Sequence, residues 1–295
     1  MAVNYSRFDG WRLKLLSINT NSGALLAANA AKSAAALMDE AMTRLSTGKR
    51  LNTAADDPAA MQVAIRMGAE INGLERALKN ANDAQAVVDT AEGALKEVHT
   101  VLLRMRELAV SGSSETHSSA DRTALNTEVS ALETEITRLG SSTTWGGINL
   151  LNGTYSSGNP ILFQLGPRGG DTITVTIGYV HATTAANAQG TLGLTSDVTT
   201  ITNASNYISV IDNAISIISQ RRGSLGAVSN RLNSSISNLT NMKTNLQKAK
   251  GQVEDADFAA ETAKLARAQI LMQAATAMLA QANASKNNTL KLITG

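Results

Sequence analysis

Few residues in this 295-residue chain have the types and spacing that catalysis or metal binding requires. The three histidines, His99, His117 and His181, are far apart, and none belongs to an HExxH zinc-binding pattern. The chain has no cysteine, which excludes disulfides, thiolate metal sites and cysteine nucleophiles. It also lacks a serine nucleophile elbow and the Gly-x-x-x-x-Gly-Lys loop that binds phosphate. The sequence therefore predicts no catalysis, no cofactor and no bound metal.

The one acidic cluster that could be imagined as a metal site contains Glu254, Asp255 and Asp257. It directly precedes an alanine-rich helical pattern, where carboxylates cap the first turn and offset the helix dipole. We therefore interpret Asp255 or Asp257 as a helix cap. His99 and His117, each two residues from a glutamate, are interpreted as solvent-facing helix and loop residues.

Composition narrows the class of partner. Aromatic residues make up 3% of the chain, so any core depends on aliphatic residues, which suits thin helical bundles. The formal net charge of +2 is too balanced to predict a nucleic-acid partner. No run of 18 apolar residues exists, so we expect no membrane span. The first 17 residues lack the apolar core of a signal peptide.

Two long stretches carry apolar residues at every seventh position, which is the pattern of helices packed lengthwise on other helices. One series is Ile211, Ile218, Leu225, Leu232, Leu239, Leu246 and Val253. The other is Leu74, Ala81, Val88, Leu95, Leu102 and Ala109. A helix of the first series would be on the order of 60 Å long at ~1.5 Å per residue, and it must find partner helices elsewhere.

Start and stop signals divide the rest of the chain. We expect an alanine-rich helix over 22–47 ended by Gly48, and a second helix capped by Asp57 and running to about residue 110. A third helix begins after Ser118, with Asp121 at the reciprocal capping position, and stops at Gly140. A last helix runs from the acidic cluster toward residue 292.

Between residues 140 and 207 the period changes. Alternating apolar residues at 161–165 and 173–177, separated by a Gly-Gly-Asp turn, predict one or two β-hairpins. Residues 179–206 carry weak signals and are expected to form an exposed insertion. The predicted fold is mainly α: long antiparallel helical rods in a coiled-coil-like bundle, a small β-hairpin region, and paired N- and C-terminal helices.

The two terminal helices are rich in alanine and bury little apolar area. At ~25 cal/mol per Å² this gain does not offset an ordering entropy of ~1–2 kcal/mol per residue. We infer that the chain ends become ordered by packing against other copies of the chain. The apolar residues expected to serve this packing are Leu37, Leu45, Phe258, Leu265, Met272 and Leu279.

Several stretches of the chain resemble bacterial flagellin. They include INTN at 18–21, LSTGKRLNTAADDPA at 45–59 and LRMRELAV at 103–110. LGAVSNRL at 225–232, VEDADFA at 253–259 and ATAMLAQAN at 275–283 continue the likeness on the C-terminal side. Together they cover about 18–178 and 205–295, in order, on both sides of the insertion.

The resemblance implies a secreted, self-assembling structural subunit of the flagellar filament, extracellular, serving motility and exported by the type III apparatus of the flagellum. Implied partners are other copies of the chain, an export chaperone, and hook-associated and cap proteins. The implied organisation is an atypical extension at 1–17, filament-core helices at 18–57 and 255–295, rod segments at 58–178 and 207–254, and a short variable insertion at 179–206.

Members of this family are also sensed by an innate immune receptor, Toll-like receptor 5. The resemblance places the matching contacts at Arg104, Leu108 and Glu128. The competing interpretation is that Leu108 is a core residue and that Arg104 and Glu128 make interhelical or intersubunit contacts.

Three departures from the family pattern and two alternative functions remain. The 17 residues before Ile18 exceed the usual start, Trp145-Gly146-Gly147 replaces the more common Phe-Asn-Gly, and the terminal arginine is missing. A hook–filament junction protein would match less well at 45–59 and 253–259. A flagellin-derived surface adhesin would bind glycans through 140–206, which has few aromatic residues.

Overall fold

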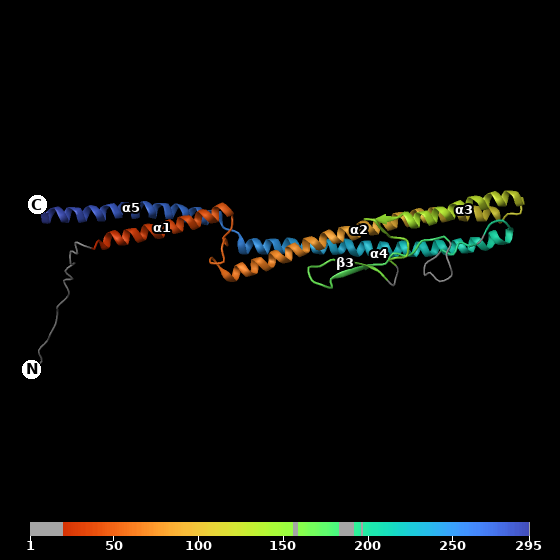
Figure 1. Ribbon diagram of the computed structural model, residues 1–295, viewed down its shortest axis with the longest axis horizontal. Coiled ribbons are helices and arrows are strands. Elements are labelled where there is room, and N and C mark those ends of the chain that lie inside the picture. The colour runs from red at the N-terminus through yellow and green to blue at the C-terminus, as the bar shows by residue number, and fades with distance from the viewer. Residues whose placement is uncertain (1–19, 156–158, 183–191, 196, 295) are drawn as a thin grey trace, which may run out of the picture. The chain divides into compact units, whose positions relative to one another are not determined.

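The computed structural model describes residues 20–155, 159–182, 192–195 and 197–294. The expected extension at 1–17 lies outside these residues. The chain divides into two compact units: unit 1 comprises Met1–Ile65 and Lys250–Gly295, and unit 2 comprises Arg66–Ala249. Helices dominate both units, as the seven-residue repeats predict, and two small antiparallel hairpins lie in unit 2 (Figure 1).

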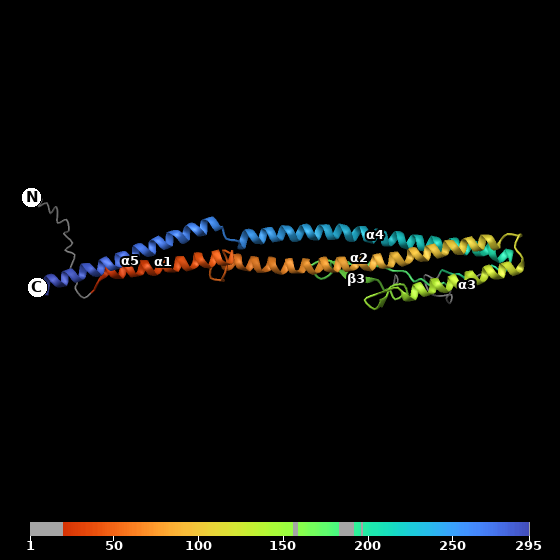
Figure 2. The same cartoon turned by 90° about the horizontal axis from the view of Figure 1, so that it is seen from above.

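Unit 1 is built on two antiparallel helices, α1 (Ser22–Thr47) and α5 (Phe258–Thr294), which lie side by side in both views (Figures 1 and 2). The side chain of Asn21 caps α1 by accepting from the Ala24 amide at 3.0 Å. Gly48 ends α1 in the left-handed conformation, with φ of 69°, as predicted. Asp257 caps α5 by accepting from the amides of Ala259 and Ala260.

The contact between α1 and α5 is made of small side chains. Ala27, Ala34 and Ala41 are buried on α1, and Ala268 and Ala275 are buried on α5. On each helix these alanines are seven residues apart, so they form one stripe facing the partner helix. The small side chains let the two helices approach closely, but each contributes little apolar area.

Unit 2 is organised around α2 (Pro58–Gly112) and α4 (Ile201–Glu254). Every residue of the 74–109 heptad series is at most 1% exposed, and the 211–253 series is buried from Ile211 to Leu239 and half-buried at Leu246 and Val253. Ion pairs from Arg106 to Asp212 at one end and from Lys243 to Glu75 at the other show that the helices are antiparallel. The predicted rods are therefore confirmed, and each is the partner of the other.

Helix α3 (Ser119–Ser142) packs on this pair through Val129 and Ile136, which are both buried. Ser118 and Asp121 form the predicted capping box. The expected stop at Gly140 is wrong, because α3 continues to Ser142. Gly140 lies against the chain at Val180: an added Cβ would come within 2.1 Å of the Val180 carbonyl oxygen.

The hairpins occupy the region where the apolar period changes. β1 (Thr144–Trp145) pairs with β2 (Ile148–Asn149), and β3 (Ile161–Gln164) pairs with β4 (Thr172–Val175). The second hairpin is the one expected from the alternation. The departure at Trp145-Gly146-Gly147 forms the turn of the first, with both glycines at positive φ.

The expected exposed insertion at 179–206 needs correction. Among its described residues, Val180, Leu192, Leu194 and Val198 are at most 3% exposed and belong to the core of unit 2. The amides of Leu192 and Leu194 donate to the carbonyls of His181 and Ala182. Helix α4 begins at Ile201, inside the expected insertion. The few apolar residues of this stretch therefore cover the bundle.

A buried polar contact fixes α3 on α4. Tyr207 is fully buried, and its hydroxyl donates a hydrogen bond to Oε1 of Glu133. Burial raises the pKa of Glu133 above its ordinary value of 4.5, although the Tyr207 hydroxyl lowers it in part. Burial, and then the bond to Glu133, raises the pKa of Tyr207. Burial therefore destabilises the ionised carboxylate of Glu133, and the hydrogen bond from the Tyr207 hydroxyl offsets part of that destabilisation.

We expect Tyr207→Phe to lower the unfolding free energy at neutral pH by about 1–2 kcal/mol, because a half-buried carboxylate loses its donor. Glu133→Gln keeps an acceptor for the hydroxyl and should cost less.

The folded pKa of Glu133 is raised, so the native protein binds more protons and gains stability as pH falls through that pKa toward 4.5. Glu133→Gln removes this gain. Urea unfolding of the three proteins between pH 4 and 8 tests both statements. A larger loss for Glu133→Gln than for Tyr207→Phe at neutral pH would refute the first, and an unchanged pH dependence in Glu133→Gln would refute the second.

Candidate functional site

The groups that could do chemistry are dispersed or already engaged. Among the described residues no group of three or more histidine, cysteine, aspartate or glutamate side chains could hold a metal ion. Glu254 pairs with Lys49 and Lys250, and Asp257 caps α5. No helix in the described ranges combines the length and apolarity that crossing a membrane would take.

The three histidines are half-buried rather than solvent-facing as expected for His99 and His117. Nε2 of His117 lies 3.1 Å from the hydroxyl of Ser111, which holds the loop between α2 and α3. The ring of His181 stacks on Tyr179 with centroids 5.8 Å apart. These contacts shape local structure and bring no two histidines together.

The six residues predicted to serve packing between copies fall into two groups. Leu45, Leu265, Met272 and Leu279 are half-buried beside the alanine stripe, so within one chain they border the contact between α1 and α5. Leu37 and Phe258 are 51% and 57% exposed. Leu37 therefore lies off the buried face of its helix.

Further apolar side chains of unit 1 lie outside the buried alanine stripe. Together with Leu37 and Phe258, those that are more than 45% exposed are Leu25, Leu26, Met42, Ile65, Ile270, Leu271 and Met278. Exposed apolar area of this kind on a small helical unit marks an interaction surface. A single copy of the chain leaves this surface uncovered within its described residues.

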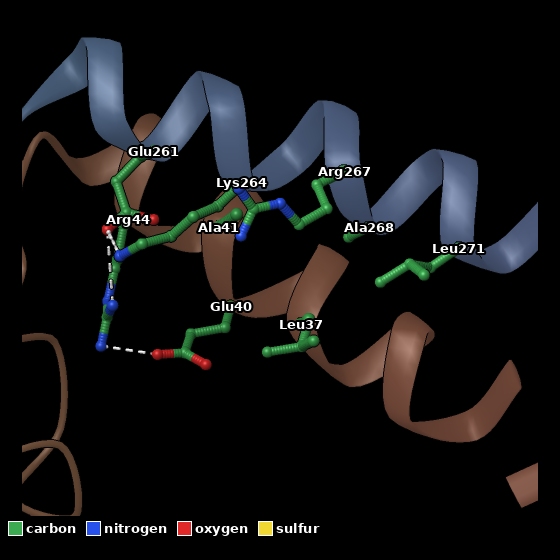
Figure 3. A pocket seen from close by; sticks show the side chains of 9 residues that line it. All are labelled: Leu37, Glu40, Ala41, Arg44, Glu261, Lys264, Arg267, Ala268 and Leu271. Carbon is green, nitrogen blue, oxygen red and sulfur yellow. Dashed lines mark hydrogen bonds and ion pairs between the residues drawn. The ribbon is translucent and has the colours of Figure 1, made fainter. Parts of the chain in front are cut away.

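A hollow of about 220 Å³ lies between α1 and α5 (Figure 3). Ala41 and Ala268 form its buried base, and Leu37 and Leu271 are its exposed apolar walls. The charged residues that line it are Glu40, Arg44, Glu261, Lys264 and Arg267. It therefore combines an apolar base with a charged rim, all within unit 1.

Ion pairs join most of the charges around the hollow. Arg44 contacts Glu40 at 2.6 Å and Glu261 at 3.5 Å, and Lys264 contacts Glu261 at 2.7 Å (Figure 3). Glu261 is only 5% exposed, and its Oε2 atom has no hydrogen-bond partner in the described part of the chain. Among the residues that line the hollow, none forms an ion pair with the guanidinium of Arg267 (Figure 3).

The residues matched to receptor recognition lie in unit 2. The guanidinium of Arg104 on α2 contacts Oε1 of Glu128 on α3 through Nε at 2.9 Å and Nη2 at 2.8 Å. These bonds, with one to Glu107, raise the pKa of Arg104. Arg104 and Glu128 are exposed, whereas Leu108 is 4% exposed and packs in the core. The structure therefore brings two of the three residues together at the surface.

Comparison with known proteins shows which family combines these features. The bacterial flagellin N-terminal helical region matches residues 18–156, and the C-terminal helical region matches residues 208–293. The chain belongs to the bacterial flagellin family. It is similar to a flagellin of Halalkalibacterium halodurans, with 38% identity over 86% of this chain and 91% of that protein. It is also similar to polar flagellin F of Vibrio parahaemolyticus, with 28% identity over 94% of this chain and 99% of that protein.

Among solved structures, a putative flagellar hook-associated protein from Vibrio parahaemolyticus shares the fold. The TM-score is 0.57 at 15% identity, over 68% of this chain and all of that one. At this identity the likeness shows the fold alone, so it does not favour the junction-protein alternative. The two matched family regions instead support a structural subunit of the flagellar filament, which is not an enzyme.

Sequence reasoning missed the hollow and its charges. The signal that could have found it is Glu261, which occupies the position seven residues before Ala268 and fourteen before Ala275. A carboxylate in a buried helix stripe needs a cationic partner. Arg44 is the arginine available on the facing helix, three residues after Ala41.

Proposed function

We propose that flagellin-family assembly in this chain runs through unit 1, with the α1–α5 pair forming the filament core and the rod segments of unit 2 forming the next layer. The observation that carries this proposal is the set of exposed apolar side chains on α1 and α5. In this assignment residues 18–57 and 255–295 are the core segments and 58–178 and 207–254 the rod.

The energetics of the pair support this assignment. Its buried stripe consists mainly of alanine, so the apolar area that one copy buries between α1 and α5 is small. Leu37, Phe258 and Met278, each more than half exposed, would be covered by neighbouring copies. Covering a large apolar side chain contributes about 1.5–3 kcal/mol, which accumulates over several residues per subunit.

The partners proposed for this chain follow from its family. Copies of the chain form the homopolymer, and hook-associated and cap proteins would meet the same terminal helices at the filament ends. An export chaperone would cover α5 before secretion through the type III apparatus, since α5 carries exposed Ile270, Leu271 and Met278. We assign no nucleic acid, membrane or cofactor to this function.

Electron microscopy of purified protein seeded with short filament fragments tests the structural role. The full chain and a variant beginning at Ile18 are run side by side. Filaments that elongate from either form support the proposal. Failure of both to elongate, with each monomer folded by circular dichroism, would refute it and favour the adhesin or junction alternatives.

We further propose that Arg104 and Glu128 form the surface contacted by Toll-like receptor 5. Their support is the exposed, bidentate contact between α2 and α3 in the region that resembles the receptor-recognised part of the family. Leu108 is buried, so its proposed role is to pack α2 beneath this surface. Arginine in a fixed, exposed geometry is a frequent anchor in protein interfaces.

Arg104→Asp is expected to reduce receptor signalling at least about tenfold, because it places like charges beside Glu128 and Glu107 and removes the anchor. Arg138→Asp is the matched control, since Arg138 is also an exposed arginine paired with a glutamate on its own helix. Reporter cells expressing the receptor give the readout. An unchanged signal from Arg104→Asp, or an equal loss from Arg138→Asp, would contradict the assignment.

A further inference from the structure

One cationic group of the hollow in unit 1 is left without a counterion. Arg44, Lys264 and Arg267 supply three positive charges there, against two carboxylates from Glu40 and Glu261. The two carboxylates are taken up by Arg44 and Lys264. In the described part of the chain, Arg267 makes no ion pair or side-chain hydrogen bond. The hollow thus carries an excess of one positive charge beside an apolar base.

One carboxylate on the same two helices also has no counterion among the described residues. Helices α1 and α5 carry three acidic residues, Asp39, Glu40 and Glu261. Glu40 and Glu261 are paired, whereas the exposed carboxylate of Asp39 has no partner among the described residues. Asp39 is therefore available to a cationic group on a partner surface, and complementary charges of this kind fix the register of an interface.

Asp39 cannot reach the hollow of its own chain. It lies two residues before Ala41, which is about 200° around the helix from the buried stripe at 100° per residue. It therefore occupies the far side of α1. Its neighbours one turn away on that side are Ala35, Ala36, Met42 and Thr43, of which Met42 is 53% exposed. This outer face of α1 therefore places the exposed Asp39 carboxylate beside Met42 and alanine, with the exposed Lys32 about two turns toward the N-terminus on the same side.

We infer that the outer face of α1 in one copy docks onto the hollow of a second copy, with Asp39 paired to Arg267 of that copy. Met42 and the adjoining alanines then cover Leu37 and Leu271 at the walls of the hollow. A second copy is the proposed occupant because of charge complementarity: α1 has one unpaired carboxylate, α5 has one unpaired guanidinium, and the two charges are opposite in sign. This inference rests on the proposed polymerisation through unit 1 and identifies the residues that form the contact between copies.

The geometry of such a contact gives an open assembly. The donor patch and the acceptor hollow are different surfaces of one chain, so each copy offers both and contacts two neighbours. Heterologous contacts that do not close into a ring generate helical filaments. An isologous contact would have to form both Asp39–Arg267 pairs between the same two copies, which requires the outer face of α1 and the hollow to belong to one surface. The arrangement of charges therefore favours a chain of copies over a dimer.

Complementary charge reversals test the pairing. Asp39→Arg alone and Arg267→Asp alone should each raise the critical concentration for seeded elongation at least about tenfold, because like charges meet at every contact. An equimolar mixture of the two variants should elongate in alternating copies. At one contact the introduced arginine of the first variant meets the introduced aspartate of the second, and at the next contact the native Asp39 meets the native Arg267. The Asp39→Arg/Arg267→Asp double variant should also elongate. Sedimentation and electron microscopy measure all four samples, and circular dichroism checks that each monomer is folded.

Asp255→Arg is the control for net charge, because Asp255 is an exposed acidic residue of unit 1 outside α1 and α5. The Asp255→Arg/Arg267→Asp double variant has the same net charge as Asp39→Arg/Arg267→Asp, but it should not elongate better than Arg267→Asp alone. Normal elongation of either single variant, failure of the complementary mixture and the double variant, or equal rescue by Asp255→Arg would overturn the inference. A chain that lacks residues 259–295 separates the two proposals. If this chain does not assemble while the two single charge-reversal variants do, the Asp39–Arg267 pairing is refuted and polymerisation through unit 1 is supported.

Discussion

A chain truncated after Phe258 is expected to add to no filament and to keep a folded unit 2. The deletion removes α5 and with it Ala268 and Ala275, the residues against which the alanine stripe of α1 packs. Helix α1 then has no helix to pair with and buries nothing, so it should unfold in isolation. Seeded elongation followed by electron microscopy should fall from full growth to none.

Unit 2 supplies the control for the truncation. Its core comes from α2, α3 and α4, and none of its residues lies in the deleted segment. The truncated chain should therefore retain a cooperative thermal transition with the midpoint of the full chain. Filaments that grow from truncated protein would show that α5 is not required for polymerisation. Loss of the unit 2 transition would show that the deletion acts through global unfolding.

Gly140→Ala is expected to destabilise unit 2 by about 3 kcal/mol, which corresponds to a fall in Tm of roughly 6–12 °C for a domain of this size. The added Cβ would stand 2.1 Å from the carbonyl oxygen of Val180, a backbone atom that cannot rotate away. Either α3 shifts or the chain at Val180 moves. Movement there breaks the hydrogen bond from the Val180 amide to the Leu151 carbonyl.

The same substitution at a different helical glycine gives a matched control with the opposite sign. Gly223 and Gly226 lie in α4 with no atom within 4 Å of an added Cβ. Alanine there gains helix propensity without a clash, so each change should stabilise unit 2 by about 0.5–1 kcal/mol. Differential scanning calorimetry compares the three variants. Equal stability of Gly140→Ala and the native chain would mean that this region is looser than the structure shows.

Much of the helical fold could be predicted because heptad spacing decides burial directly. Leu74 and Leu102 on α2, and Ile211 and Leu232 on α4, are buried as their spacing predicts. The caps of α1, α3 and α5 were predictable for a local reason, since a cap is satisfied by amides within a few residues. Such signals need no knowledge of distant chain segments.

The errors share a different cause, because each depends on a contact between distant segments. Gly140 resembles a helix stop, but glycine is required there because the backbone at Val180 lies too close for a Cβ atom. Leu192 and Leu194 lie among threonine and asparagine residues that predict an exposed loop, yet they cover the bundle. Leu37 was expected to pack against other copies and stays a prediction, since it is exposed while alanine occupies the buried face of α1. Periodicity alone does not show which of two neighbouring faces meets the partner helix.

The candidate interaction surfaces were predictable only in part. The alanine-rich composition of the terminal helices indicated packing between copies, and it located α1 and α5. The charged hollow was not foreseen, because its members come from two helices more than 200 residues apart in sequence. The position of Arg104 beside Glu128 likewise depends on how α3 returns along α2. Only the folded chain brings these residues together.

Hydrogen exchange of backbone amides, measured on the monomer and on the filament, tests the central claim that unit 1 is completed by other copies. In the monomer, amides of α1 and α5 should exchange within minutes, because the pair buries little more than alanine. Amides of α2 and α4 in unit 2 should be protected in both states. In the filament, α1 and α5 should become the segments with the largest gain in protection. Strong protection of α1 and α5 in the monomer, or no gain in the filament, would contradict the account.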